Sequence, residues 1–204
     1  MIKFFDLEKQ DKSLHKSILR DIKKLFKRGD FILGKEVLKF EKNFAKFCES
    51  NYAISCANGT DALTIALKSL NLEKNSEVII PAMTYCSTAF SVINANLKPV
   101  LVDTEPFKPT IDASKIKKKI TSKTKVIMPV HLYGSAANLN AIKKIIKKNN
   151  IFLIDDCAQA HGTIDDSNTT YNKKIGSTAD ISCFSLYPGK NLGAYGDAGI
   201  ITTN

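Results

Sequence analysis

The stretch "EVIIPAMTYCSTAFSVINANLKPVLVD" (77–103) contains a strand, a helix and a second strand in close succession. The segment "EVIIP" (77–81) is rich in β-branched residues and stops at Pro81, and "KPVLVD" (98–103) has a similar composition. The residues between them predict a helix that runs to about residue 95. Two strands joined in this way pair in parallel, because the helical crossover returns the chain to the same edge of the sheet.

The same alternation extends over the rest of the chain. Helices are expected at 12–28, 36–48, 60–70 and 138–149, and strands at 52–56, 125–130, 151–155, 181–186 and 198–203. We expect the strand at 52–56 to be buried. The pattern predicts an α/β fold with a mostly parallel sheet, helices on both faces, and one domain over residues 1–204. Ligands of such sheets bind at the carboxyl ends of the strands.

Charge and composition narrow the classes of protein. The formal net charge of +10 could indicate nucleic-acid binding, but Arg20 and Arg28 are the only arginines, and arginine is the usual reader of phosphates and base edges. The lysines of "AIKKIIKKNN" (141–150) alternate with isoleucines, which predicts an amphipathic helix with a solvated face. We therefore expect no nucleic-acid partner. No apolar run approaches the roughly 20 residues of a membrane span, so we expect no membrane partner either.

The cysteines indicate the compartment. Five are present, an odd number, and no C-x-x-C pair occurs. This pattern argues against a zinc site or a disulfide framework and favours a reducing cytoplasm. The N-terminal segment mixes acidic and basic residues and is therefore a poor signal peptide.

Two loops at strand ends carry candidate ligand groups. In "CANGTDAL" (56–63), Asn58 and Gly59 predict a turn and Thr60 is placed to cap the next helix, whose start would suit a phosphate. A plain strand-to-helix turn explains the same residues. In "DDCAQAHG" (155–162), adjacent strand residues point opposite ways, so one of Asp155 and Asp156 should face a ligand. A helix cap or a solvent-exposed turn is the alternative.

The third candidate is Lys190 in "CFSLYPGKNLGAYGDAG" (183–199), a glycine-rich turn between two apolar runs. A lysine held there is partly desolvated, which favours a nucleophilic amine that can form a Schiff base with an aldehyde. A lysine that extends to water is the alternative. Together, a phosphate cradle, a strand-end aspartate and a loop lysine are the three groups that pyridoxal 5′-phosphate (PLP) requires.

At this point the sequence resembles the DegT/DnrJ/EryC1/StrS aminotransferases, which act on nucleotide-linked keto sugars. The resemblance covers nearly the whole chain. It is carried by "FFDL" (4–7), "FILGKEVLKFEKNFAKFC" (31–48), "YAISCANGTDALTIAL" (52–67), "VIIPAMTYCSTAFSVINANLKPVLVD" (78–103), "PVHLYGSAANL" (129–139), "LIDDCAQAHG" (153–162) and "GSTADISCFSLYPGKNLGAYGDAGIITTN" (176–204).

The resemblance implies a role for each of seven residues. It implies that Lys190 is the Schiff-base lysine and that Asp156 is the partner of the pyridine nitrogen. The remaining positions are implied to bind the cofactor: Gln159 near its phenolic oxygen, Tyr85 stacked on its ring, and Gly59, Thr60 and Ser185 at its phosphate. His131 and His161 are acid–base candidates from the residues alone, but histidines satisfied by local hydrogen bonds are commoner.

The resemblance further implies the fold and activity of a PLP-dependent transferase of the aspartate aminotransferase type, here as the large domain without the smaller C-terminal domain of family members. The partners it implies are a nucleotide-sugar substrate, glutamate as the amino donor, and a second copy of the chain in a homodimer. Related enzymes with histidine in place of the lysine are dehydratases, so Lys190 favours transamination. A PLP-dependent dehydratase and a cofactor-binding remnant without turnover are the alternatives.

Overall fold

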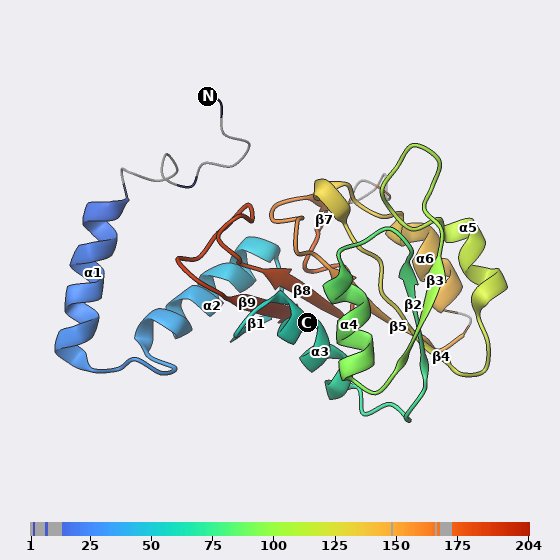
Figure 1. The fold of residues 1–204 in the computed structure, drawn as a ribbon, viewed down its shortest axis with the longest axis horizontal. Helices are drawn as coiled ribbons and strands as arrows, with labels where there is room; N and C mark the ends of the chain where they lie inside the picture. Colours follow the sequence, from blue (N-terminus) through green and yellow to red (C-terminus); the bar gives the residue numbers. More distant parts are fainter. Residues whose placement is uncertain (1, 3–6, 8–13, 148, 166, 168–172) are drawn as a thin grey trace.

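The structure is a computed structural model of residues 1–204, and it describes all of them except 1, 3–6, 8–13, 148, 166 and 168–172 (Figure 1). The first helix, α1 (His15–Arg28), agrees with the predicted helix at 12–28. Residues 12 and 13 of that prediction, and residues 4–6 of the "FFDL" motif, lie outside the described residues.

A seven-stranded sheet forms the centre of the molecule, with strand order β1-β9-β8-β5-β4-β2-β3. Its strands are β1 (Tyr52–Cys56), β2 (Glu77–Pro81), β3 (Lys98–Val102), β4 (Thr124–Ile127), β5 (Phe152–Asp156), β8 (Ile181–Ser185) and β9 (Gly199–Thr203). The five strands from β8 to β3 pair in parallel. The predicted mostly parallel sheet is therefore confirmed.

Helices cover both faces of the sheet, as the alternating sequence predicts. One face packs on α3 (Gly59–Ser69) and α4 (Cys86–Asn94), with Val78 and Ile80 of β2 in the shared core. The opposite face packs on α2 (Lys35–Cys48), α5 (Ala113–Ile116) and α6 (Leu139–Ile146), where Ile79 is buried. Because neighbouring strand residues point to opposite faces, one run of apolar residues supplies both cores.

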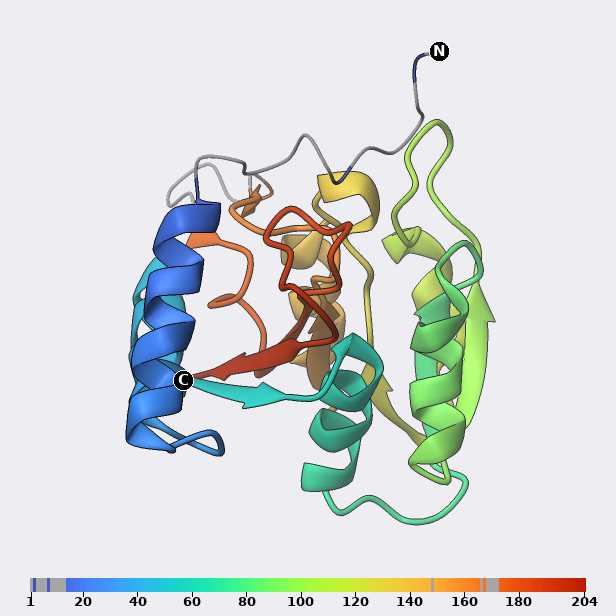
Figure 2. The ribbon, with the colours of Figure 1, turned by 60° about the vertical axis from the view of Figure 1, so that its left-hand side comes forward.

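One expectation about the edge of the sheet needs correction. Strand β1 is not buried, because it forms the sheet's edge and leaves Tyr52 63% and Ile54 50% exposed. It pairs antiparallel with β9, and β9 pairs antiparallel with β8, as the strand directions in Figure 2 show. The loop 186–198 produces this reversal, since the chain returns to the sheet without a crossover helix.

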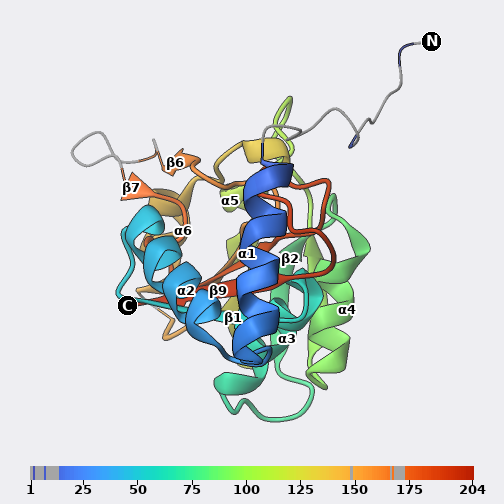
Figure 3. The same cartoon turned by 90° about the vertical axis from the view of Figure 1, so that its left-hand side faces the viewer.

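Some short elements were not expected from the sequence. They are the hairpin of β6 (Ile164–Asp165) with β7 (Lys173–Lys174), and two 3₁₀ turns at Lys117–Lys119 and Leu132–Gly134. Helix α1 lies at the outer end of the molecule, beyond α2, and has no buried residue (Figures 1 and 3). None of the helices in the described part of the chain is long and apolar enough to cross a membrane.

Candidate active site

A cavity of about 740 Å³ opens at the carboxyl ends of the parallel strands. All seven residues assigned to the site from the sequence line it: Gly59, Thr60, Tyr85, Asp156, Gln159, Ser185 and Lys190. They come from segments up to 131 positions apart, from Gly59 to Lys190. The parallel sheet brings them together because its strands end at the same edge.

The start of α3 forms one wall of the cavity. Here one detail of the sequence interpretation is wrong: the helix is capped by Asn58, whose Oδ1 accepts a hydrogen bond from Asp61 N–H at 2.8 Å, and not by Thr60. Thr60 instead donates its hydroxyl to Ser87 Oγ at 2.9 Å. The first N–H groups of a helix have no partner within it, so those of Gly59 and Thr60 are available at the cavity wall.

Gly59 allows α3 to approach β8 closely. A Cβ atom at this position would lie 2.7 Å from Ser185 Cβ and 3.1 Å from Ser185 Cα, closer than real side chains pack. Both neighbouring atoms belong to a strand of the central sheet, so neither can move without moving the strand. Gly59 and Ser185, two of the three residues predicted to bind phosphate, are thus adjacent only because position 59 lacks a side chain.

Asp156 ends β5 and is buried, with 5% of its surface exposed. Its Oδ2 accepts a hydrogen bond from Thr88 Oγ1 at 2.8 Å, and its Oδ1 accepts one from Ala158 N–H at 3.1 Å. Burial raises the pKa of the Asp156 carboxyl above its usual value, although these two hydrogen bonds and the charges of His131 and Lys190 act in the opposite direction. A cationic N–H group in the cavity would stabilise the carboxylate further.

Asp155 points to the other side of β5 and does not line the cavity. It is fully buried, and its Oδ2 lies 3.4 Å from His131 Nε2. Of the two acids, only Asp156 lines the cavity, as the alternation of side chains along a strand predicts. His131 is also fully buried and does not line the cavity; its Nδ1 accepts a hydrogen bond from Ala137 N–H at 3.1 Å, while its Nε2 makes no hydrogen bond to any described residue.

The amide of Gln159 is oriented by the main chain. Its Oε1 accepts a hydrogen bond from Tyr133 N–H at 2.7 Å. Because that bond uses the oxygen, Nε2 is the group that remains to donate at the cavity wall. The arrangement suits a negatively charged oxygen on a bound ring.

Lys190 is half-buried in a tight turn, where its N–H donates to Tyr187 O at 2.8 Å. It lines the main cavity and also a second cavity of about 560 Å³, which shares Gln159 and Tyr187 with the first and includes His161. Burial, followed by the charge of Lys190, lowers the pKa of His161 to about 4, so its imidazole is neutral at neutral pH. Tyr85, at the mouth of the main cavity, is 69% exposed.

Sequence reasoning missed the hydroxyl groups behind Asp156. Thr88 is fully buried on α4 and holds Asp156 Oδ2, while its Oγ1 is 2.7 Å from Thr84 Oγ1. Both threonines lie in the "MTYCST" segment, from which only Tyr85 was selected. Thr84 precedes α4, so helical spacing does not link the two threonines, and the sequence carries no local signal for the contact with Asp156.

Comparisons with known proteins agree with this geometry. The model of the DegT/DnrJ/EryC1/StrS aminotransferase family matches residues 12–204, so the "FFDL" motif (4–7) lies before the matched region. A dTDP-3-amino-3,6-dideoxy-alpha-D-galactopyranose transaminase of Aneurinibacillus thermoaerophilus is 44% identical, over 100% of this chain and 55% of its own length. A UDP-2-acetamido-2-deoxy-3-oxo-D-glucuronate aminotransferase of Pseudomonas aeruginosa is 40% identical, with the same coverage.

Among solved structures, S. venezuelae DesV in complex with a ketimine intermediate superimposes with a TM-score of 0.93 at 34% identity, over 99% of this chain and 53% of DesV. The chain thus spans about half the length of the relatives it matches. The family model covers nearly all of the sequence and the fold agrees throughout. The chain belongs to the DegT/DnrJ/EryC1/StrS aminotransferase family.

Proposed function

We propose that the main cavity binds PLP and that the protein transfers an amino group to a nucleotide-linked keto sugar. The observation that carries this proposal is that Asp156 and Lys190 line one cavity, together with the start of α3 and Ser185. A buried carboxylate whose pKa is raised by burial suits the protonated nitrogen of a pyridine ring, because the two opposite charges then compensate each other.

The other groups of the cavity fit the rest of the cofactor. The free N–H groups of Gly59 and Thr60 and the hydroxyl of Ser185 suit a phosphate, since the positive end of the helix dipole adds to their hydrogen bonds. Gln159 Nε2 suits the phenolic oxygen, and Tyr85 suits the face of the ring. Residues 1–204 would then form the PLP-binding large domain.

When bound, PLP would supply an aldehyde carbon and a protonated ring that withdraws electrons from the α-carbon of an amino acid. Asp156 would keep the ring nitrogen protonated, with Thr88 and Ala158 holding both of its oxygens. Lys190 Nζ would hold the aldehyde covalently and, once released, move a proton from the donor's α-carbon. A positioned base contributes about 10²–10⁴-fold to such a step.

The two named relatives support the substrate class, since one is a transaminase of a dTDP-linked sugar and the other an aminotransferase of a UDP-linked sugar. The second cavity supports the same reading, because it shares Lys190 with the first and so gives a substrate access to the reacting amine. Glutamate is the proposed donor. The amino-sugar product would be used for a surface polysaccharide.

We also propose a homodimer and a cytoplasmic location. Met83 and Tyr85 beside the cavity and Phe90 and Ile93 on α4 are exposed, and such apolar side chains are typical of an interface. The five cysteines are all free, which favours a reducing compartment.

The test uses the purified protein with PLP. We expect visible absorbance from the lysine-bound cofactor, and its bleaching when glutamate is added, with one equivalent of 2-oxoglutarate formed. A keto sugar nucleotide should then restore the colour and yield the amino sugar. Absence of colour in the unaltered protein would refute the proposal. Colour without transfer from glutamate would favour a cofactor-binding remnant, and loss of a hydroxyl from the sugar would identify a dehydratase.

A further inference from the structure

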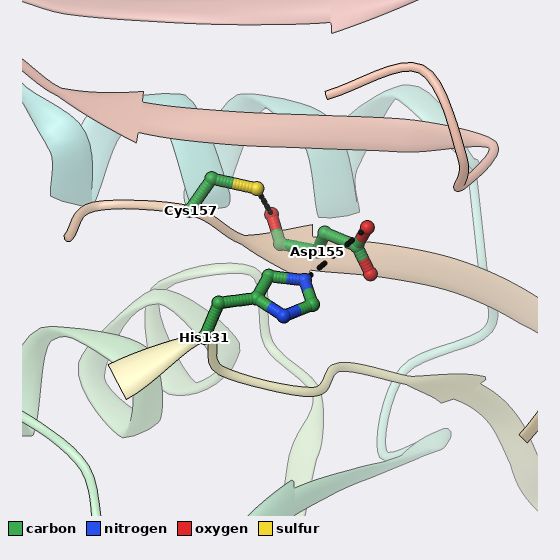
Figure 4. Close-up of side chains that lie close together, drawn as sticks. All are labelled: His131, Asp155 and Cys157. Atoms are coloured by element: carbon green, nitrogen blue, oxygen red, sulfur yellow. Dashed lines mark hydrogen bonds and ion pairs between the residues drawn. The ribbon is translucent and has the colours of Figure 1, made fainter. Parts of the chain in front are cut away.

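A cluster of buried polar groups lies behind the cavity, on the other side of β5. It consists of His131, Asp155 and Cys157, none of which is measurably exposed, and one potential ligand atom from each lies within 4.8 Å of the others (Figure 4). Groups of these types can bind a metal ion. The hydrogen bonds around the cluster decide against that role.

The imidazole of His131 has the wrong tautomer for a metal ligand. Its Nδ1 accepts the N–H of Ala137, so Nδ1 carries the lone pair and the proton lies on Nε2, which faces Asp155 Oδ2 at 3.4 Å. The thiol of Cys157 donates to Asp155 O at 3.7 Å, and burial raises its pKa well above the usual value, so it is not a thiolate. The cluster is therefore a close polar pair, with His131 Nε2 3.4 Å from Asp155 Oδ2 but not hydrogen-bonded to it, and not a set of metal ligands.

This contact is joined to the cavity through the main chain. His131 N–H donates to Asp156 O at 3.1 Å, and Asp156 N–H donates to Pro129 O at 2.9 Å. The side chain of His131 thus contacts Asp155 while its backbone contacts the next residue, Asp156. A displacement of the imidazole would shift both acids together.

The same imidazole closes the loop 131–137. Within that loop Tyr133 has φ 55° and ψ 24°, a left-handed conformation that costs a non-glycine residue about 1–3 kcal/mol and persists only where its surroundings impose it. The hydrogen bond from Ala137 to His131 spans the loop, and Tyr133 N–H in turn holds Gln159 Oε1. His131 therefore contacts both the backbone of Asp156 and the loop whose Tyr133 N–H holds the side chain of Gln159.

We propose that His131 is a positioning residue for the cofactor site, acting together with Asp155. Resting on the proposed function, this inference assigns to one buried imidazole the alignment of the two side chains that would meet the ring nitrogen and the phenolic oxygen of the cofactor. His131 does not line the cavity and does not touch the reacting atoms.

The experiment measures the Kd of PLP and the absorbance maximum of the bound form, with unfolding followed separately. The variant H131N keeps an acceptor near Ala137 N–H but cannot reach Asp155, and H131Q can reach Asp155 but cannot accept from Ala137. We expect each to weaken PLP binding by about tenfold to a hundredfold and to shift the absorbance maximum, as displacement of a positioned group by about 1 Å does.

The control is I142V, which shortens a fully buried side chain of α6 away from the cavity. It should lower the melting temperature without changing the Kd or the absorbance maximum, which separates positioning from general loss of stability. The His131 variants would overturn the inference if they kept the Kd and absorbance maximum of the unaltered protein.

A second pair of variants covers the case in which the His131 variants do not fold. D155N keeps a polar oxygen beside His131 Nε2, so its Kd should stay within about threefold, whereas D155L removes that oxygen and should weaken binding by about tenfold or more. Equal affinities for D155N and D155L would overturn the inference. If the unaltered protein binds no PLP, the proposed function fails, and the inference fails with it.

Discussion

The hydroxyl of Thr88 allows a quantitative test of how Asp156 is held. Its bond to Asp156 Oδ2 is 2.8 Å long and fully buried, and a hydrogen bond to a charged group contributes about 1.5–3 kcal/mol. T88V keeps the shape of the side chain and removes the donor. If that energy supports the charged carboxylate in the complex, the Kd of PLP should rise by about tenfold to 150-fold, since 1.4 kcal/mol is a factor of ten.

A matched control lies one turn further along α4. Ser91 is also fully buried, but its hydroxyl donates at 2.8 Å to the carbonyl of Thr88 and makes no contact with Asp156. S91A should cost a similar amount of stability and leave the Kd unchanged, as measured by titration with PLP followed by absorbance. Equal changes in Kd for T88V and S91A would refute the reasoning.

The pH dependence of stability gives T88V a second signature. The Thr88 bond lowers the pKa of Asp156 because it stabilises the charged form, against the larger effect of burial, which raises the pKa. Without the bond, the Asp156 carboxyl of the folded protein keeps its proton to higher pH. The stability deficit of T88V should therefore be small in acid and grow as the pH rises to neutral. Urea unfolding of the cofactor-free protein measures this, and a deficit independent of pH would contradict it.

Three further predictions follow from single residues. G59A should bring its new Cβ within 2.7 Å of Ser185, cost about 1–3 kcal/mol by overpacking, and weaken the binding of PLP more than that of pyridoxal, which lacks the phosphate; equal weakening would count against the phosphate site. D156N should abolish PLP binding and stabilise the cofactor-free protein at neutral pH, because the raised pKa of the Asp156 carboxyl means that its ionisation opposes folding. Urea midpoints at acidic and neutral pH check this, and a loss of stability at both pH values would contradict it. The pKa of His161 is about 4 in the folded protein against an ordinary value of 6.5, so the contribution of His161 to stability should grow as the pH rises through that interval. H161F, which can pack against the same Phe184 ring, should therefore make the urea midpoint depend less on pH. If the pH dependence were unchanged, His161 would be excluded as its source.

The order of strands and helices was predictable because local composition determines it. The β-branched run at 77–81 and the lysine–isoleucine pattern at 141–150 became β2 and α6, with Ile142 and Ile145 buried as the pattern indicates. Pairing partners were not predictable in the same way. Strand β9 runs antiparallel because the loop 186–198 returns the chain without a crossover helix, and the exposure of β1 depends on its place at the edge, which is a property of the whole sheet.

The residues of the site likewise divide into those that the sequence predicts and those that it does not. Asp156 was selected because it ends a strand and Lys190 because it lies in a glycine-rich loop after one, and the sheet brings such positions together. The contacts that hold them were not selected, because Thr88 is an ordinary helical threonine until its distance to Asp156 is known. The cap of α3 was assigned to Thr60 for the same reason, since Asn58 and Thr60 are both good capping residues and only the backbone decides between them.

The most direct measurement is chemical trapping of the lysine that holds the cofactor. The protein would be loaded with PLP, reduced with borohydride to make the link permanent, digested, and mapped by mass spectrometry. Among the lysines in the part of the chain that the structure describes, only Lys190 lines the cavity, and the label should appear on its peptide alone. A label on another lysine, with the Lys190 peptide unmodified, would contradict the claim that this amine and Asp156 hold the same ring.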